Sequence, residues 1–126
     1  MPASYGSAAK AKATKLHSLF VRMRDGFTCR WCGVSRDSGK QIQCAHMISR
    51  SISGTRTDER NAVALCAKCH WQQKKNPLLW VYWLMEELGK PHLDDLLERG
   101  VPGIMVDWDD EVVRLTAAID DLKKKE

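Results

Sequence analysis

The stretches CRWC at residues 29–32 and CAKC at residues 66–69 decide the fold of this chain. Each is a Cys-x2-Cys pair, and its tight turn places two sulfur atoms on one side of the loop, at the spacing of two corners of a tetrahedral zinc site. The two pairs together predict one structural zinc ion held by four thiolates: Cys29, Cys32, Cys66 and Cys69. The alternatives are an iron or iron–sulfur centre and four unrelated buried thiols.

The segment between the two pairs carries a further element. Its 33 residues exceed the usual spacing of a zinc ribbon. It contains a fifth cysteine, Cys44, two residues before His46. A small buried hydrophobic side chain is the favoured role for Cys44, and a ligand role is the alternative.

Length and composition predict one intracellular domain. A chain of 126 residues with 44% hydrophobic residues can bury a modest core, which a bound metal would reinforce. No run of eighteen apolar residues is present, and residues 1–15 lack the apolar segment of a secretory signal. We therefore expect a cytoplasmic location, with cysteines that are reduced or metal-bound rather than disulfide-paired.

Charge is distributed unevenly along the chain, whose net charge is +4. When Lys and Arg are counted against Asp and Glu, residues 1–28 carry +4, residues 29–76 carry +6 and residues 77–126 carry −6. A basic first part and an acidic last part indicate one face that meets a polyanion such as DNA. By itself this charge pattern also fits an ordinary soluble protein.

Apolar periodicity predicts a mostly helical α+β protein around a small β element. The first predicted helix carries an apolar stripe of Leu16, Leu19, Phe20 and Met23. The expected elements are, in order, a helix over residues 8–23, a knuckle and turn over 27–39, a strand or hairpin arm over 40–48, a polar loop over 49–59, an ordered stretch from 61 that becomes helical from 66 to 75, and helices over 77–88, 92–99 and 107–125.

These elements predict a single domain over residues 1–126. Residues 1–14 are expected to be a flexible, basic N-terminus, residues 27–76 the core, and residues 77–126 a helical extension. Asn76 and Pro77 are typical of a helix start, and Gly89 of a helix end.

The core sequence resembles that of a known enzyme family. QCAHMISR at residues 43–50, GTRTDERN at 54–61 and LCAKCH at 65–70 follow the first cysteine pair in the order Ala-His-x-Ile, Asn, Cys-x2-Cys-His. This order is similar to that of the HNH endonucleases, which have a zinc-stapled ββα-metal (His-Me finger) core. The detailed sequence looks most like the phage NinG/Rap recombination nucleases, over roughly residues 15–100.

The resemblance implies a metal-dependent DNA endonuclease in a phage or bacterial cell. Three residues fall at the family's eponymous positions and are the candidate catalytic residues: His46, Asn61 and His70. His46 would be the general base that activates water, because a neutral imidazole titrates near the working pH. Asn61 would orient that ring or bridge the hairpin arms, with capping of the following segment as the alternative. His70 would bind the catalytic ion, Mg²⁺ or another divalent metal, with a place beside the zinc site as the alternative.

The chain departs from the family pattern immediately before the base. Many HNH enzymes have an acidic residue or a histidine there as a metal ligand, whereas this chain has Ala45. Asp58 or Glu59 could supply the missing ligand, or water and the DNA phosphate could complete the shell. The departure leaves open a non-catalytic zinc DNA-binding module. A phage recombination factor that binds or resolves branched DNA is a further alternative.

Basic and aromatic side chains near the motif are candidates for DNA contact. Arginine matches phosphate oxygens in a bidentate manner, which favours phosphate contact for Arg50 and Arg56 over solvated loop charges. Arg60 fits both roles equally. Trp71, Trp80 and Trp83 could stack on bases, but Trp80 and Trp83 lie on an apolar predicted helix, so core packing is favoured for those two.

The last predicted helix carries a narrow apolar stripe of Val112, Leu115, Ile119 and Leu122. Such a stripe packs on the protein's own core or pairs with its twin in a second copy. The helix is too short for a stable isolated coiled coil, so we expect it to dock within the chain. A monomer is therefore favoured, with a homodimer as the alternative.

Overall fold

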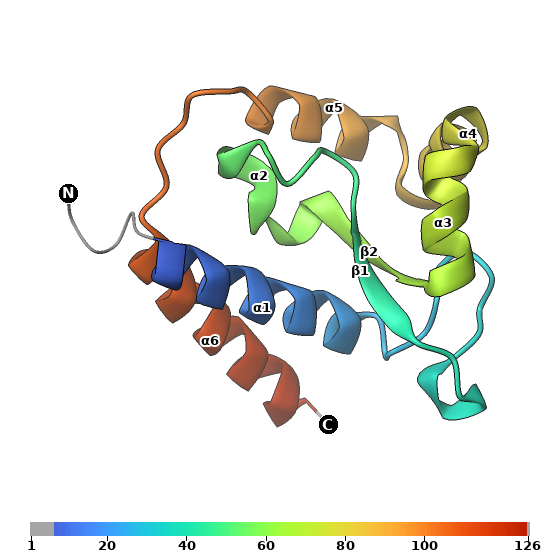
Figure 1. Ribbon diagram of the computed structural model, residues 1–126, viewed down its shortest axis with the longest axis horizontal. Helices are drawn as coiled ribbons and strands as arrows, with labels where there is room; N and C mark the ends of the chain where they lie inside the picture. The colour runs from blue at the N-terminus through green and yellow to red at the C-terminus, as the bar shows by residue number, and fades with distance from the viewer. Residues whose placement is uncertain (1–6, 126) are drawn as a thin grey trace.

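A two-stranded antiparallel hairpin lies at the centre of the computed structural model, which describes residues 7–125 (Figure 1). β1 (Ile42–His46) pairs with β2 (Ala62–Cys66), in a register that runs from Ile42 opposite Cys66 to His46 opposite Ala62. All five residues of β2 are buried, and the strand leads directly into α3 (Ala67–Lys75). Two strands and one helix thus form a ββα unit, within a mostly helical α+β fold.

The first helix, α1 (Ser7–Arg24), contacts both strands of the hairpin. Its fully buried face consists of Ala13, His17 and Val21, which recur every four residues. The buried face is centred on His17, and a pattern of apolar residues does not include a histidine. The predicted stripe is therefore only partly buried; it consists of Leu16, Leu19, Phe20 and Met23.

Residues 7–14, which were expected to belong to a flexible N-terminus, form the first turns of α1 in the structure. These turns are ordered because Ala13 packs against Trp108 and Leu115 of the last helix. The remainder of that expectation, over residues 1–6, lies outside the described part of the chain.

The connection between the strands contains two short helical turns where a polar loop is predicted. These are α2 (Ser53–Arg56) and η3 (Glu59–Asn61). Their order comes from polar side chains that are buried within the connection: Thr55, Thr57 and Asn61. A third short turn, η2 (Arg36–Ser38), lies in the knuckle after the first cysteine pair.

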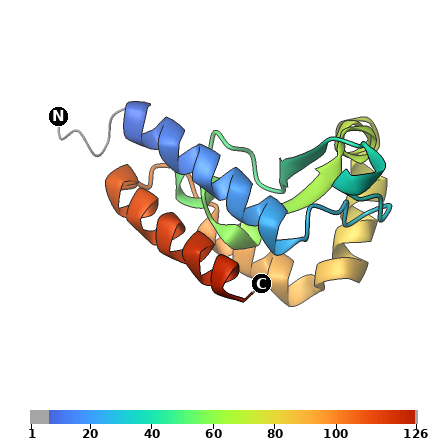
Figure 2. The same ribbon diagram turned by 90° about the horizontal axis from the view of Figure 1, so that it is seen from below.

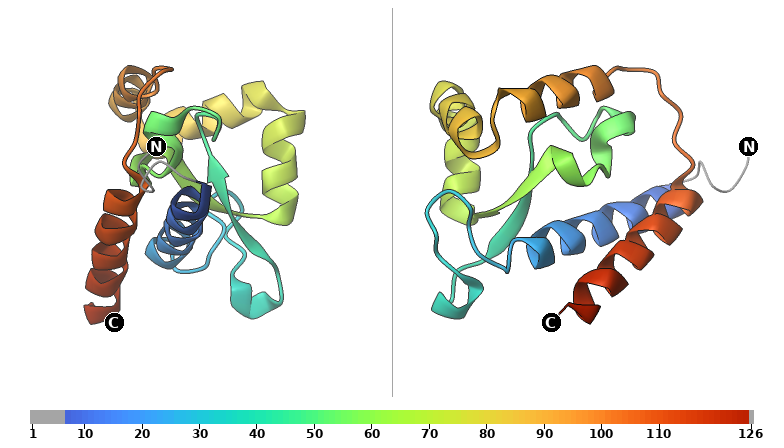
Figure 3. Two further views of the ribbon diagram at one scale, coloured as in Figure 1. Left: turned by 60° about the vertical axis from the view of Figure 1, so that its left-hand side comes forward. Right: turned by 180° about the vertical axis from the view of Figure 1, so that it is seen from behind.

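The helical extension begins with α4 (Pro77–Leu88) and α5 (Lys90–Arg99). The predicted start at Pro77 is confirmed, although the side chain of Asn76 makes no capping hydrogen bond. α5 lies on the opposite side of the hairpin from α1 (Figure 3). Core packing is confirmed for Trp80, which is buried and stacks on Trp83 at a ring-centroid distance of 5.4 Å.

The last helix, α6 (Trp108–Lys124), runs beside α1, and the two helices pack together (Figure 2). Asp107 caps it by accepting hydrogen bonds from the backbone N–H groups of Asp109 and Asp110. Two residues of its predicted stripe, Leu115 and Ile119, are buried by the protein's own chain. The expected docking within the chain is thus confirmed. No helix within residues 7–125 is long and apolar enough to cross a membrane.

Candidate functional site

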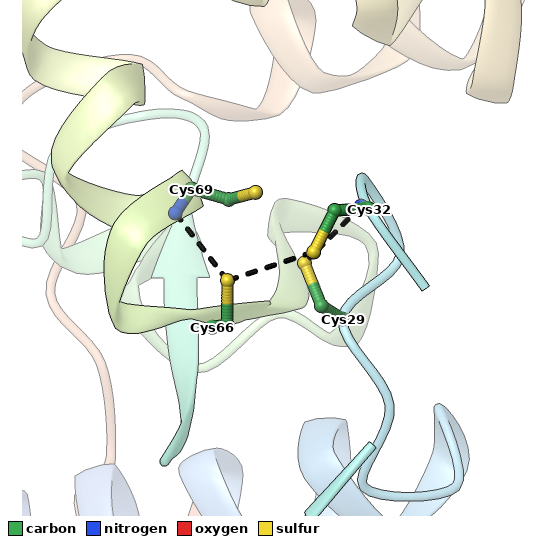
Figure 4. A group of neighbouring side chains, drawn as sticks. All are labelled: Cys29, Cys32, Cys66 and Cys69. Atoms are coloured by element: carbon green, nitrogen blue, oxygen red, sulfur yellow. Dashed lines mark hydrogen bonds between the residues drawn. The ribbon is translucent and has the colours of Figure 1, made fainter. Parts of the chain in front are cut away.

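The four predicted zinc ligands come together in space (Figure 4). Their sulfur atoms all lie within 4.8 Å of one another, and the sulfurs of Cys32 and Cys66 are 3.7 Å apart. Each knuckle has a backbone N–H group directed at its own first sulfur, from Cys32 to Cys29 and from Cys69 to Cys66, both at 3.5 Å. Four convergent thiols with such supporting donors fit a structural zinc ion. The ion would join the loop after α1 to the start of α3.

A separate cavity of about 440 Å³ lies between the end of β1 and α3. His46, the last residue of β1, and His70, in the first turns of α3, both line it. The structure therefore brings together two of the three residues that the resemblance places in catalysis. The other lining residues are Cys44, Met47, Arg50, Gln73, Lys74 and Trp80.

The ring of His46 is held by the backbone of the inter-strand connection. Its Nε2 donates a hydrogen bond to the carbonyl oxygen of Arg56 at 2.8 Å. Because a carbonyl only accepts, Nε2 carries the proton and Nδ1 carries the lone pair. Burial lowers the pKa of His46, and the positive charges of Arg50 and Arg56 act in the same direction. The imidazole is therefore neutral near pH 7, as a general base must be.

Asn61 does not line the cavity but bonds across the connection that holds His46. Its side chain is fully buried. Its amide oxygen accepts from the backbone N–H of Ile48 at 2.7 Å, and its amide nitrogen donates to the carbonyls of Ile48 and Thr55, both at 3.0 Å. The carbonyl that accepts from His46 belongs to the next residue, Arg56. The side chain of Asn61 thus links the residue before β2 to the connection after β1, and its predicted role in the site stays a prediction.

His70 is oriented by a side chain that the sequence analysis did not single out. Its Nδ1 donates to the amide oxygen of Gln43 at 2.7 Å. This leaves Nε2 without a hydrogen-bond partner in the described part of the chain. A histidine that binds a metal commonly donates its other N–H to an oxygen in this way. It directly follows Cys69, one of the four clustered cysteines, at the start of α3.

Asp58 and Glu59 are not brought to this cavity. Asp58 accepts from the backbone N–H of Arg60 and from the guanidinium of Arg99, both at 2.9 Å. Glu59 pairs with Arg114, and both acidic residues line a different cavity, beside α6. The expectation that one of them joins His70 as a metal ligand is therefore not met. None of the residues lining the His46–His70 cavity is acidic, so water and a phosphate oxygen would have to complete a metal shell there.

The arginines of the connection differ in their contacts. Arg50 is exposed and lines the cavity, and it makes no side-chain hydrogen bond or ion pair within residues 7–125. Arg56 donates from Nε to the hydroxyl of Thr14 at 2.9 Å and from Nη1 to the carbonyl of Arg50 at 3.0 Å. Arg60 forms an ion pair with Asp95 at 3.1 Å. Arg50 is thus the arginine best placed for a phosphate.

Residues 29–76 match the family model described as HNH endonuclease. The match spans both cysteine pairs, the hairpin and α3. It supports the HNH family and indicates a nuclease or a nucleic-acid-binding protein. Comparison with curated proteins and comparison with solved structures give no match.

Residues 29–76 pack on a histidine that lies outside them and that the sequence analysis missed. The imidazole of His17, on α1, is fully buried, and its centroid is 5.1 Å from that of His46. Its Nε2 donates to the carbonyl of Asp58 at 2.9 Å, and burial lowers its pKa to about 4. The signal in the sequence is its place midway between Ala13 and Val21 at helical spacing, on the buried face of α1.

Proposed function

We propose that this protein is a metal-dependent DNA endonuclease that hydrolyses phosphodiester bonds with His46 as the general base. One observation carries the proposal. His46 and His70 line the same cavity, and each has one ring nitrogen tied by a hydrogen bond and the other left with no partner in the described chain.

The residues of the cavity take separate roles in the proposed reaction. The guanidinium of Arg50 and the ammonium of Lys74, which line the cavity, would hold the DNA phosphate. Nδ1 of His46 would accept a proton from a water molecule as that water attacks phosphorus. Asn61 would keep the connection in place and so keep the ring of His46 aimed at the water.

His70, through Nε2, would hold a divalent ion such as Mg²⁺. When bound, that ion supplies positive charge for the phosphorane and for the leaving 3′-oxygen. The proposed products have 5′-phosphate and 3′-hydroxyl ends. In this proposal Asn61 and Gln43 do not contact DNA. Asn61 orients His46 through the connection, and Gln43 orients His70 through its hydrogen bond.

A plasmid-nicking assay with and without Mg²⁺ tests the proposal. Replacing His46 with Ala is expected to lower the rate by about 10²–10⁴-fold, since that is what general base catalysis contributes. Zinc content and DNA affinity should stay near those of the wild-type protein. His92→Ala is the matched control, because His92 lies outside the cavity and bonds to the carbonyl of Arg60.

Two outcomes of this assay would contradict the proposal. A His46→Ala rate above about half that of the wild-type protein would mean that another group is the base. DNA binding without Mg²⁺-dependent cleavage by the wild-type protein would favour the non-catalytic zinc module. The non-catalytic module is favoured by one observation: no acidic side chain lines the cavity.

A role on branched DNA, as in the phage NinG/Rap branch, is the finer form of the proposal. It is supported by the sequence GTRTDERN at residues 54–61. Comparing cleavage of a four-way junction with cleavage of matched duplex tests it. Equal rates on both substrates would remove the recombination role and leave a general nuclease.

A further inference from the structure

We propose that His17, Cys44 and His46 form a second metal site, separate from the four-cysteine site, that binds a thiophilic ion such as Zn²⁺ and so occupies the base nitrogen. Binding at this site does not depend on nuclease activity. Its inhibitory effect rests on the proposed function. The site would make the enzyme sensitive to zinc beyond the one structural ion.

The three side chains converge from two elements. Cys44 and His46 are two residues apart on β1, so they project from the same face of the strand. His17 comes from α1, which packs on that strand. One ligand atom from each residue lies within 4.8 Å of the other two. Neighbouring ligand atoms in a tetrahedral zinc site are about 3.5 Å apart, so small side-chain movements would close the site.

Hydrogen bonds decide which ring nitrogens keep a lone pair for a metal. The Nε2 atoms of His17 and His46 both donate to backbone carbonyls, those of Asp58 and Arg56. Each imidazole therefore keeps its lone pair on Nδ1, the atom that a metal would bind. A neutral imidazole with its other nitrogen fixed by an oxygen acceptor is the usual state of a histidine that binds a metal.

His17 provides the observation that points to a ligand. Its side chain is fully buried, yet its Nδ1 has no hydrogen-bond partner in the described chain. A buried polar atom without a partner lowers stability, and such atoms are uncommon in native proteins. Coordination of an ion between His17, Cys44 and His46 would satisfy this nitrogen.

The donor set selects the kind of ion. Two imidazoles and one thiol suit zinc and other borderline or soft ions, whereas Mg²⁺ and Ca²⁺ require oxygen ligands. Cys44 and His46 also line a cavity of about 270 Å³ on the side of α1, through which an ion can enter and a water molecule can fill the fourth position. Arg22 and Arg50 line the same cavity and oppose a free cation, so the thiolate must supply the compensating charge.

The consequence for catalysis follows from the shared nitrogen. On binding, the thiol of Cys44 releases one proton to solvent, and its sulfur forms a bond to the metal. Nδ1 of His46 then donates its lone pair to the ion and has none left for the proton of a water molecule. The metal-bound protein is therefore expected to lack its general base.

The binding test uses the full-length protein with one zinc in the four-cysteine site, verified by elemental analysis. Co²⁺ is then added as a spectroscopic probe. We expect one further equivalent to bind, with a sulfur-to-cobalt charge-transfer band and with no loss of zinc. The band should disappear in Cys44→Ser and persist in the matched control His92→Gln, whose histidine lies outside the site.

A second measurement needs no variant. Added Zn²⁺ should protect Cys44 of the wild-type protein from alkylation by iodoacetamide, as mapped by mass spectrometry. The absence of a further bound equivalent, a charge-transfer band that persists in Cys44→Ser, or unchanged alkylation of Cys44 would each overturn the proposed site.

The inhibitory effect is tested in the Mg²⁺-dependent nicking assay. Added Zn²⁺ should lower the wild-type rate to that of His46→Ala. The rate of Cys44→Ser with added Zn²⁺ should stay close to the rate of the same variant without Zn²⁺. If the wild-type protein does not cleave DNA at all, the proposed nuclease function fails, and the cobalt experiment still decides whether the site exists. Equal inhibition of both proteins would place the inhibition elsewhere and overturn the link to His46.

Discussion

At the scale of single residues, His17 shows how the fold sets the protonation of a side chain. It is fully buried, and the groups that face it are His46, Arg24 and Asp58. Burial is the largest cause that lowers its pKa, and the charges of His46 and Arg24 add to it. The hydrogen bond to the carbonyl of Asp58 acts in the opposite direction but does not compensate.

This shift predicts a loss of stability in acid. The pKa of His17 falls from 6.5 to about 4 on folding, so the unfolded chain binds more protons than the folded chain between these values. The stabilisation is fully present above about pH 6.5 and is lost as the pH falls toward about 4, to an extent of about 3 kcal/mol. Urea unfolding of the zinc-loaded protein, without added metal, measures it.

The comparison protein for this measurement is His17→Gln, which cannot take up the proton. Acid also weakens zinc binding by the cysteines, and this effect is common to both proteins, so the difference between their pH profiles isolates His17. Identical pH dependence in the two proteins would show that His17 is not held neutral by the fold.

At the scale of elements, the connection between β1 and β2 gives different surroundings to Arg50 and Arg56, for which the sequence predicts the same phosphate contact. Arg50 lies exposed at the cavity, whereas two nitrogens of Arg56 are bonded within the protein. We predict that Arg50→Ala weakens binding to all DNA sequences alike and lowers the slope of log affinity against log salt concentration by about one.

Arg56→Ala provides the internal comparison for that prediction. Its loss breaks the bonds to Thr14 and to the carbonyl of Arg50, so it should lower the melting temperature and change the salt slope less than Arg50→Ala does. Fluorescence anisotropy at several salt concentrations measures the slopes. An unchanged slope in Arg50→Ala would show that Arg50 is a solvated loop charge and does not contact the phosphate.

The elements also show what the sequence can predict. Helices α4 and α6 were predicted almost to the residue, because Pro77, Gly89 and the acidic first turn of α6 are local signals. Strand β2 was not predicted from periodicity, because AVALC is a continuous apolar run that fits a buried strand or a helix. The turns α2 and η3 depend on long-range bonds of Asn61 and on burial, which leave no local pattern.

In the candidate site, too, the sequence predicted some features and not others. The cysteine spacing predicted the four-cysteine cluster, and the motif predicted that His46 and His70 would meet. The roles of Gln43 and His17 could not be predicted, since each depends on a partner at least 27 residues away in the chain. Asp58 lay within reach of the motif in sequence, but its pairing with Arg99 of α5 directs it away.

At the scale of the whole molecule, the four-cysteine cluster joins the loop after α1 to β2 and α3, together with the backbone hydrogen bond from Arg30 to Ala64 and the packing of Trp31 on Trp80. The apolar core is divided between one cluster around the hairpin and α4 and a smaller cluster between α1 and α6. The predicted zinc ligands Cys29, Cys66 and Cys69 belong to the first cluster. A metal held by these thiols would add to the hydrogen bonds and packing that keep the loop after α1 beside β2.

Removing the metal is predicted to unfold the core. Structural zinc contributes about 10–16 kcal/mol in small zinc proteins, which exceeds or equals the total stability of about 5–15 kcal/mol typical of a domain. Elemental analysis should find one tightly bound zinc, and a strong chelator should abolish cooperative thermal unfolding measured by circular dichroism. Iron in place of zinc, or a chelated protein that still melts cooperatively, would contradict this role.

The last prediction concerns α6, whose docking on α1 favours a monomer. Trp108, Leu115 and Ile119 are buried against the rest of the chain, and each such side chain contributes about 1.5–3 kcal/mol. Deleting residues 107–126 should therefore lower the melting temperature strongly while light scattering reports a monomer before and after. Because the deletion removes much of a typical domain's stability, Leu115→Ala, at a cost of about 2–5 kcal/mol, is the milder variant. A dimer that becomes monomeric when α6 is deleted or weakened would show instead that the helix also serves a subunit interface.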